Sequence, residues 1–143
     1  MPIDQEILDQ LLNQLKDYIS YIENMDFTRD ELMEDVDIQH LLSHRIHMAV
    51  EICIDMAMHV ASALELPERD SAVDVIRLLG KHGILTKKFA EKFQKAPKLR
   101  NLLIHGYAKI DYRLLYKDYK DELKDLKEFA GQINKYLEKS EAK

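Results

Sequence analysis

The sequence predicts an all-α fold, a bundle of about five helices with an up-and-down antiparallel core. Apolar residues recur at three- and four-residue spacing over long stretches, which is the period of an amphipathic helix. The 143-residue chain has only 4 Gly and 3 Pro to interrupt helices. Its 46% apolar and 33% charged residues suit a compact helical protein and argue against disorder.

The first half of the chain predicts two long helices joined by a short helical turn. The first helix covers residues 3–24 and carries an apolar stripe. Thr28 stands three residues before Glu31, the form of a capping box that can open the short turn. The second helix covers residues 37–64, which contain no Gly or Pro, and would be about 42 Å long at 1.5 Å per residue.

The second half predicts shorter helices and then one long helix. Ser71 can cap a short helix that ends near Gly83, where a left-handed backbone is expected. Thr86 can cap the next helix, and Pro97 should kink or restart it because proline fits the first turn. Asp111 can cap a last helix whose near-heptad apolar stripe continues to the C-terminus.

Composition restricts the protein to a few classes. A chain of this length predicts one domain over residues 1–143. Cys53 is the only cysteine, so no intrachain disulfide is expected. The acidic N-terminus lacks the form of a signal peptide, and we expect that no segment approaches the length of a membrane span. We therefore predict a soluble cytoplasmic protein whose net charge of −5 disfavours indiscriminate nucleic-acid binding.

The segment LRNLLIHGYAKID concentrates polar groups near an expected helix end: Arg100, Asn101, His105 and Tyr107. Asn101 and His105 share one helical line, and Arg100 and Tyr107 share the adjacent one if the helix continues past Gly106. Arginine offers a planar donor fork for phosphate, and histidine exchanges protons near neutral pH. The residues alone suit phosphodiester cleavage, but they also fit an ordinary surface ion pair and a packed tyrosine.

This segment resembles the HepT-like (DUF86) toxin family of the HEPN superfamily. R-N-L-L-I-H-G-Y matches the family pattern of Arg, four to six residues, His, any residue, Tyr. The long helix containing I-D-M-A-M-H, the short G-I-L segment and Y-A-K-I-D before a last helix follow the family's order over roughly residues 37–137. The resemblance implies a dimeric helical bundle in which the two motifs meet in one cleft and cut RNA without metal or cofactor.

The resemblance also implies a role for each motif residue. His105 would act as general base or acid toward the ribose 2′-hydroxyl or the leaving oxygen, leaving a 2′,3′-cyclic phosphate. Arg100 would stabilise charge on the phosphorane, and Asn101 would orient His105 or the phosphate. Tyr107 would be modified with AMP by a cognate MntA-like (MNT-type) nucleotidyltransferase antitoxin, which would block the cleft. Arg100 and His105 lie about 140° apart on one ideal helix, so the partner protomer or an unwound Gly106 would complete the site.

The second long helix carries a polar stripe in which the residues fall within about 80° of one another. A divalent metal could use such ligands, but closed sites usually need ligands from several elements, so we expect no metal. The stripe would instead be a solvated face, or a cleft wall in which Glu51 or Asp55 pairs with a motif arginine. Asp55 and His59 resemble family positions, although helix packing is their expected role. The stripe consists of His40, His44, His47, Glu51 and Asp55.

Two other interpretations remain open. Lysines before the motif could guide RNA to the cleft or simply form a solvated helix face: Lys87, Lys88, Lys92, Lys95 and Lys98. The chain could be a non-catalytic HEPN module that binds a nucleotide or a protein, or a purely structural helical dimerisation protein. Loss of ribonuclease activity in His105→Ala would exclude the module, and a phenotype of Arg100→Ala would exclude the structural protein.

Overall fold

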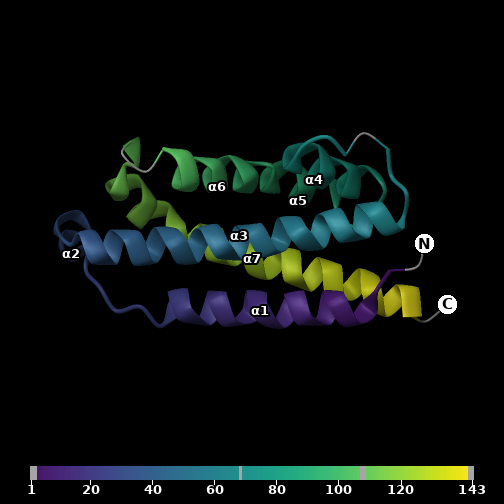
Figure 1. The fold of residues 1–143 in the computed structure, drawn as a ribbon, viewed down its shortest axis with the longest axis horizontal. Helices are drawn as coiled ribbons and strands as arrows, with labels where there is room; N and C mark the ends of the chain where they lie inside the picture. Colours follow the sequence, from purple (N-terminus) through teal and green to yellow (C-terminus); the bar gives the residue numbers. More distant parts are fainter. Residues whose placement is uncertain (1–2, 68, 107–108, 142–143) are drawn as a thin grey trace.

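The protein is helical throughout the part described by the computed structural model, which covers residues 3–67, 69–106 and 109–141. The helices in these residues are α1 (Gln5–Glu23), α2 (Arg29–Glu34), α3 (Val36–Ala63), α4 (Ala72–Lys81), α5 (Lys87–Phe93), α6 (Lys95–His105) and α7 (Tyr112–Glu141). Figure 1 shows α1, α3, α6 and α7 side by side with successive long helices reversing direction. The predicted all-α, up-and-down bundle is confirmed. The short helix α2 is the predicted turn after Thr28, and α5 and α6 are the two parts of the predicted helix that restarts near Pro97.

The helix ends follow the predicted capping residues. Thr28 Oγ1 accepts a hydrogen bond from Glu31 N–H at 3.1 Å, and the Glu31 carboxylate accepts one from Thr28 N–H, which completes the capping box. Ser71 and Thr86 accept hydrogen bonds at the starts of α4 and α5. These side chains satisfy donors that a helix start otherwise leaves unpaired. Gly83 has φ +79°, the left-handed backbone expected after α4.

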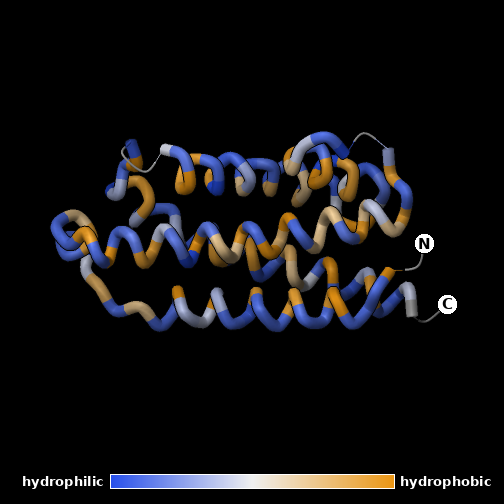
Figure 2. The backbone as a smooth tube through the Cα atoms, viewed as in Figure 1, coloured by the Kyte–Doolittle hydropathy of each residue, from blue (hydrophilic) through white to orange (hydrophobic). Residues whose placement is uncertain are grey.

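The core lies around α3, which contacts α1, α4, α6 and α7. Figure 2 shows the apolar residues of α1 turned toward α3. At the other side of the core, Phe93 of α5 stacks on Phe129 of α7 with ring centroids 5.1 Å apart, and both are almost fully buried. Burial of each such ring contributes roughly 1.5–3 kcal/mol. This packing fixes the α5–α6 segment, and therefore the motif, against the bundle.

One sequence expectation, that no segment has the form of a membrane span, is wrong for α3. Its 28 residues are long and apolar enough to cross a membrane by length and composition. However, 61% of the most apolar window is buried inside the bundle. A helix in the core of a bundle can have the same length and apolar composition as a membrane span. α3 has this composition because neighbouring helices cover several of its faces.

Candidate active site

The motif lies on α6, which packs against α3. Pro97 is buried in the first turn, where its missing N–H removes no helical hydrogen bond, and Leu103 turns inward one and a half turns later. The helix continues through His105, because Gly106 N–H still donates to Leu102 O at 2.8 Å. The backbone therefore does not unwind at the histidine, and the angular separation of Arg100 and His105 persists.

Arg100 is held from two sides. Its Nη1 donates to Glu51 Oε2 on α3 at 3.1 Å, and the side chain is only 18% exposed. Its Nε and Nη2 both donate to Asn101 Oδ1, at 3.1 and 3.0 Å. A guanidinium has five N–H donors, so two of them are unused by these bonds. Two donors are sufficient to bind a phosphate in bidentate fashion while Glu51 and Asn101 stay in place.

The carboxylates of α3 surround this guanidinium with opposing effects. Burial raises the pKa of Asp55, repulsion from Glu51 raises it further, and Arg100 lowers it. His47 Nε2 lies 3.9 Å from Glu51 Oε2. Burial lowers the pKa of His47 below its ordinary value, and attraction to Glu51 only partly opposes this. At neutral pH the neighbourhood of Arg100 thus contains a neutral imidazole and a carboxylate whose charge balances the arginine.

His105 is exposed at the C-terminal end of α6. No hydrogen bond or ion pair joins it to Arg100 within residues 3–67, 69–106 and 109–141. Five steps of about 100° separate the two residues on the helix, so they face different directions. The structure thus brings together Arg100, Asn101 and Glu51, with Asp55 close by, but leaves His105 apart. Tyr107 lies outside the described residues.

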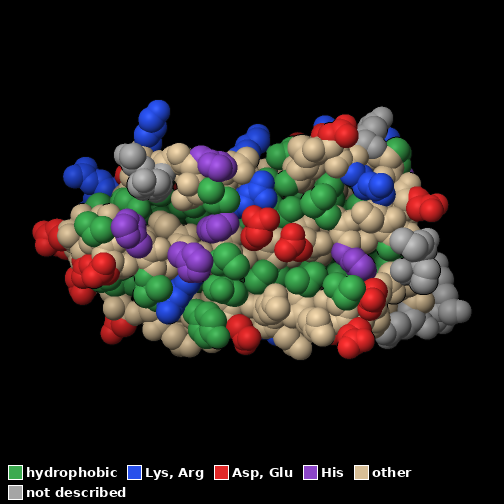
Figure 3. Space-filling view, viewed as in Figure 1, with side chains coloured by type: hydrophobic (Ala, Val, Ile, Leu, Met, Phe, Trp, Pro, Cys, Tyr) green, Lys and Arg blue, Asp and Glu red, His purple; other side chains and the backbone are tan. Residues whose placement is uncertain are grey.

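A cavity of about 360 Å³ lies beside the motif between α3, α6 and the start of α7. It is lined by His40, Ser43, His44, His47, Leu103 and Tyr112. Figure 3 shows histidines gathered on this face of the molecule, next to acidic side chains and a basic one. The Ser43 hydroxyl is buried and has no hydrogen-bond partner in the described chain. The sequence predicts that the stripe of α3 is a solvated face or a cleft wall. In the structure its histidines line a cavity together with α6, an arrangement that depends on tertiary packing.

His59 has a different role from the one considered for the cleft. Its Nε2 accepts a hydrogen bond from Asp4 N–H at 3.2 Å and so tethers the start of α1, which is the packing role we expected. Among the described residues, no group of three or more His, Cys, Asp or Glu side chains is placed to hold a metal ion. Within the stripe, Glu51 binds Arg100, and His40, His44 and His47 line the cavity.

The fold and site define a class, a helical bundle of the HEPN type with its Arg–Asn and His on one helix. Comparison with known proteins then gives the family. The family model for ribonuclease HepT-like proteins matches residues 8–133, so this chain belongs to the HepT-like family.

Three relatives illustrate the likeness. The tRNA nuclease HepT of Aphanizomenon flos-aquae is 25% identical over 136 residues, covering 95% of this chain and 91% of that protein. The mRNA nuclease HepT of Shewanella oneidensis is 22% identical over 128 residues, covering 90% and 96%. A solved structure of a tri-AMPylated HEPN toxin from the same organism in complex with an MNT antitoxin has a TM-score of 0.84 at 21% identity, covering 92% and 98%.

Proposed function

We propose that this protein is a cytoplasmic, metal-independent endoribonuclease toxin of a HEPN/MNT toxin–antitoxin system. The observation that carries the proposal is Arg100, held by Glu51 and Asn101 with two donors unused, on the same helix as the exposed His105. Membership of the HepT-like family supports ribonuclease activity. The names of the two curated relatives support RNA as the substrate class.

In the proposed reaction the ribose 2′-oxygen attacks the adjacent phosphorus. His105 removes the 2′-hydroxyl proton or protonates the departing 5′-oxygen, and water carries out the other proton transfer. General acid or base catalysis of this kind typically contributes 10²–10⁴-fold in rate. The P–O5′ bond breaks, leaving a 2′,3′-cyclic phosphate and a 5′-hydroxyl. Arg100 donates its two unused N–H groups to the phosphorane oxygens, whose charge grows in the transition state. Asn101 acts as a positioning residue because its oxygen holds Arg100.

A homodimer completes the site in this proposal. A second stripe on α3, which partly overlaps the stripe of histidines and carboxylates, faces outward at three- and four-residue spacing. It consists of residues 41, 44, 48, 51, 55 and 58. Leu41 and Met58 are 42% and 44% exposed near its two ends, with the partners of Arg100 between them. Burying this stripe against its copy would place His105 of one protomer near Arg100 of the other. Sedimentation should show dimers for wild type and for Leu64→Asp, a change outside the stripe, and monomers for Met58→Asp.

Control by an antitoxin follows from the same arrangement. We infer that an MNT-type nucleotidyltransferase transfers AMP from ATP to the hydroxyl of Tyr107, with pyrophosphate leaving. The tri-AMPylated relative supports this type of modification. Phosphates two residues from His105 would compete with the substrate phosphate for Arg100. Mass spectrometry after incubation with the antitoxin and ATP should show added AMP on wild type and none on Tyr107→Phe.

The deciding experiment is cleavage of a defined RNA in excess EDTA by wild type, His105→Ala and a control, Lys16→Ala. Lys16 is also exposed, but it lies on α1 and outside the motif. We expect cleavage by wild type and control with 2′,3′-cyclic phosphate ends, and its loss in His105→Ala. Cleavage that needs a divalent metal would contradict metal independence. No cleavage by unmodified wild type would favour the non-catalytic binding module.

A further inference from the structure

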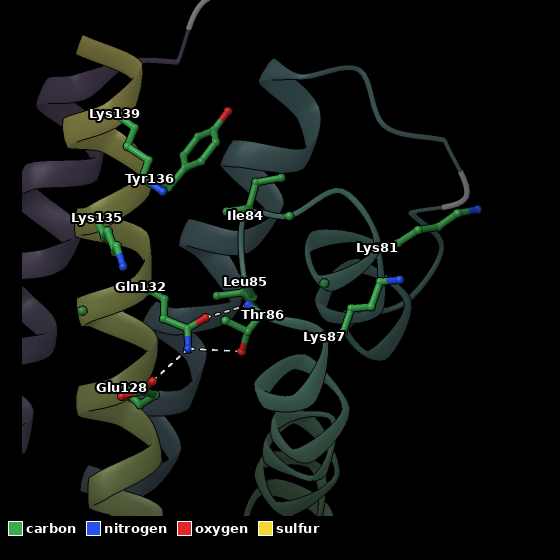
Figure 4. A pocket seen from close by; sticks show the side chains of 13 residues that line it. Lys81, Ile84, Leu85, Thr86, Lys87, Glu128, Gln132, Lys135, Tyr136 and Lys139 are labelled. Atoms are coloured by element: carbon green, nitrogen blue, oxygen red, sulfur yellow. Dashed lines mark hydrogen bonds between the residues drawn. The ribbon is translucent and has the colours of Figure 1, made fainter. Parts of the chain in front are cut away.

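A second cavity in the described part of the chain lies away from the motif, between the segment after α4 and the C-terminal half of α7. Its volume is about 550 Å³. Figure 4 shows one wall formed by α7 and the other by the segment of Ile84, Leu85 and Thr86. In Figure 1, α4, α5 and the end of α7 lie toward the end of the molecule with the two termini, whereas α6 ends at the opposite side. We call this cavity the α4–α7 groove.

The walls of the groove are fixed by hydrogen bonds. Thr86 N–H donates to Gln132 Oε1 at 2.8 Å, and Gln132 Nε2 donates to Glu128 Oε1 at 2.8 Å. The first bond joins α7 to the start of α5, and the second holds the Gln132 side chain within α7, as the dashed lines in Figure 4 show. Gly131, on the α7 wall, has no atom within 4 Å of where a Cβ would lie, so nothing fills the groove there. The opening therefore has defined walls in the unbound protein.

Positive charge collects at this groove in an otherwise acidic protein. Its lining includes four lysines, Lys81, Lys87, Lys135 and Lys139, and one acidic residue, Glu128, which gives 4 − 1 = +3. The whole chain carries −5. No ion pair involves any of these four lysines among the described residues. Figure 4 shows Lys135 and Lys139 on the α7 side of the groove, and Lys81 and Lys87 beyond the Ile84–Thr86 segment with their side chains extending away from α7.

The chemistry of this lining favours the backbone of a polyanion over a small nucleotide. The cations are separate, flexible ammonium groups, which act as point charges, and the lining contains no arginine fork for a single phosphate. Tyr136 adds a half-buried aromatic ring, a type of surface on which any base can stack. Neither the lysines nor the aromatic ring distinguishes one RNA sequence from another. A further cavity shares Thr86 and Glu128 with the groove and adds Lys88 and Lys124, which extends the basic track.

We propose that the α4–α7 groove is an RNA exosite that binds the phosphodiester backbone of the substrate at a distance from the scissile bond. The inference rests on the proposed ribonuclease function and deepens it. It explains how an acidic chain recruits a polyanion: binding is local and confined to one end of the bundle. It also implies that long RNA is a better substrate than a fragment too short to reach from α6 to the groove.

The test compares Lys135→Gln/Lys139→Gln with a charge-matched control, Lys16→Gln/Lys120→Gln, which lies outside the lining. Salt dependence is the sharp readout, because each neutralised phosphate of a single strand contributes about 0.7 to the slope of log affinity against log salt. Loss of two contacts should lower the slope of log kcat/KM by about 1.4. The ratio of kcat/KM for wild type to kcat/KM for the groove variant should therefore fall about sevenfold between 50 and 200 mM salt.

Two further readouts separate the possible results. On a tetranucleotide substrate the groove variant and wild type should be equally active, which shows that the catalytic centre is intact. Equal salt slopes on long RNA for wild type, groove variant and control would overturn the exosite. If wild type cleaves no RNA, the proposed function fails, and the same slopes measured for RNA binding by fluorescence anisotropy decide the exosite alone. Loss of antitoxin binding with unchanged RNA binding would identify a protein-docking surface instead and also overturn the proposal.

Discussion

The contact between α4 and α5 gives the sharpest test of the packing. Gly80 is buried in α4, and a Cβ added there would overlap Ala90 Cβ of α5, well inside van der Waals contact. A methyl carbon on a helix has no rotamer by which to escape, so Gly80→Ala must push the helices apart. Overpacking of this kind costs about 1–3 kcal/mol. The higher helix propensity of alanine returns about 1 kcal/mol, so we expect a net loss of up to about 2 kcal/mol.

The second-site change Ala90→Gly removes the overlapping atom and supplies the control. Ala90→Gly alone should lower the free energy of unfolding by about 1 kcal/mol or more, because glycine weakens a helix. In the double variant Gly80→Ala/Ala90→Gly the overlap is relieved. Its free energy of unfolding should therefore be about 1–3 kcal/mol higher than the sum of the two single effects predicts. Urea denaturation followed by circular dichroism gives the four unfolding free energies. Additivity within about 0.5 kcal/mol would refute the close helix approach on which this reasoning depends.

Three further predictions follow from the core, the titratable groups and the motif. Phe129→Ala should lower the free energy of unfolding by about 3–5 kcal/mol in urea, because the ring is fully buried against Phe93. Burial raises the pKa of the Glu122 carboxyl in the folded protein above its ordinary value of 4.5. The contribution of Glu122 to the free energy of unfolding is therefore fully present below about pH 4.5 and is lost as pH rises through the folded pKa. Glu122→Gln should make the melting temperature fall less steeply over this pH range. Glu51→Ala should release Arg100 and lower kcat for RNA cleavage by up to about 100-fold, whereas Glu51→Gln, which keeps an acceptor oxygen, should retain most of it in single-turnover assays.

Much of the fold follows from local rules that the sequence states directly. The capping residues Thr28, Ser71 and Thr86 act as predicted, since each needs only a backbone donor two or three residues ahead. The break before α6 likewise follows from Pro97. The misjudged property is the membrane-like composition of α3, which arises because a central helix is covered on several sides. That coverage is a property of the assembled bundle and has no local signal.

The contacts of the candidate site residues could be predicted only in part. Glu51 was expected to be able to pair with a motif arginine, and it does. Asn101 was expected to orient His105 or the phosphate, yet its oxygen holds Arg100 on the adjacent position. Helical spacing predicts which positions share a face, but a long arginine side chain can fold back to a neighbour that faces elsewhere. The cavity beside His44 depends on how α6 crosses α3, which no spacing rule specifies.

The charges around Arg100 imply that the motif and the α4–α7 groove have separate roles in the proposed function. Two carboxylates, Glu51 and Asp55, stand near one guanidinium, so the centre offers little net attraction for a polyanion in its ground state. In the proposed reaction its two unused donors bind most strongly when charge grows on the phosphorane, which is where binding energy raises kcat. On that proposal, affinity for the ground state comes from other surfaces, and the α4–α7 groove carries surplus positive charge. Removing lysines there should therefore lower kcat/KM on long RNA with kcat unchanged, whereas removing Asn101 or Glu51 should lower kcat.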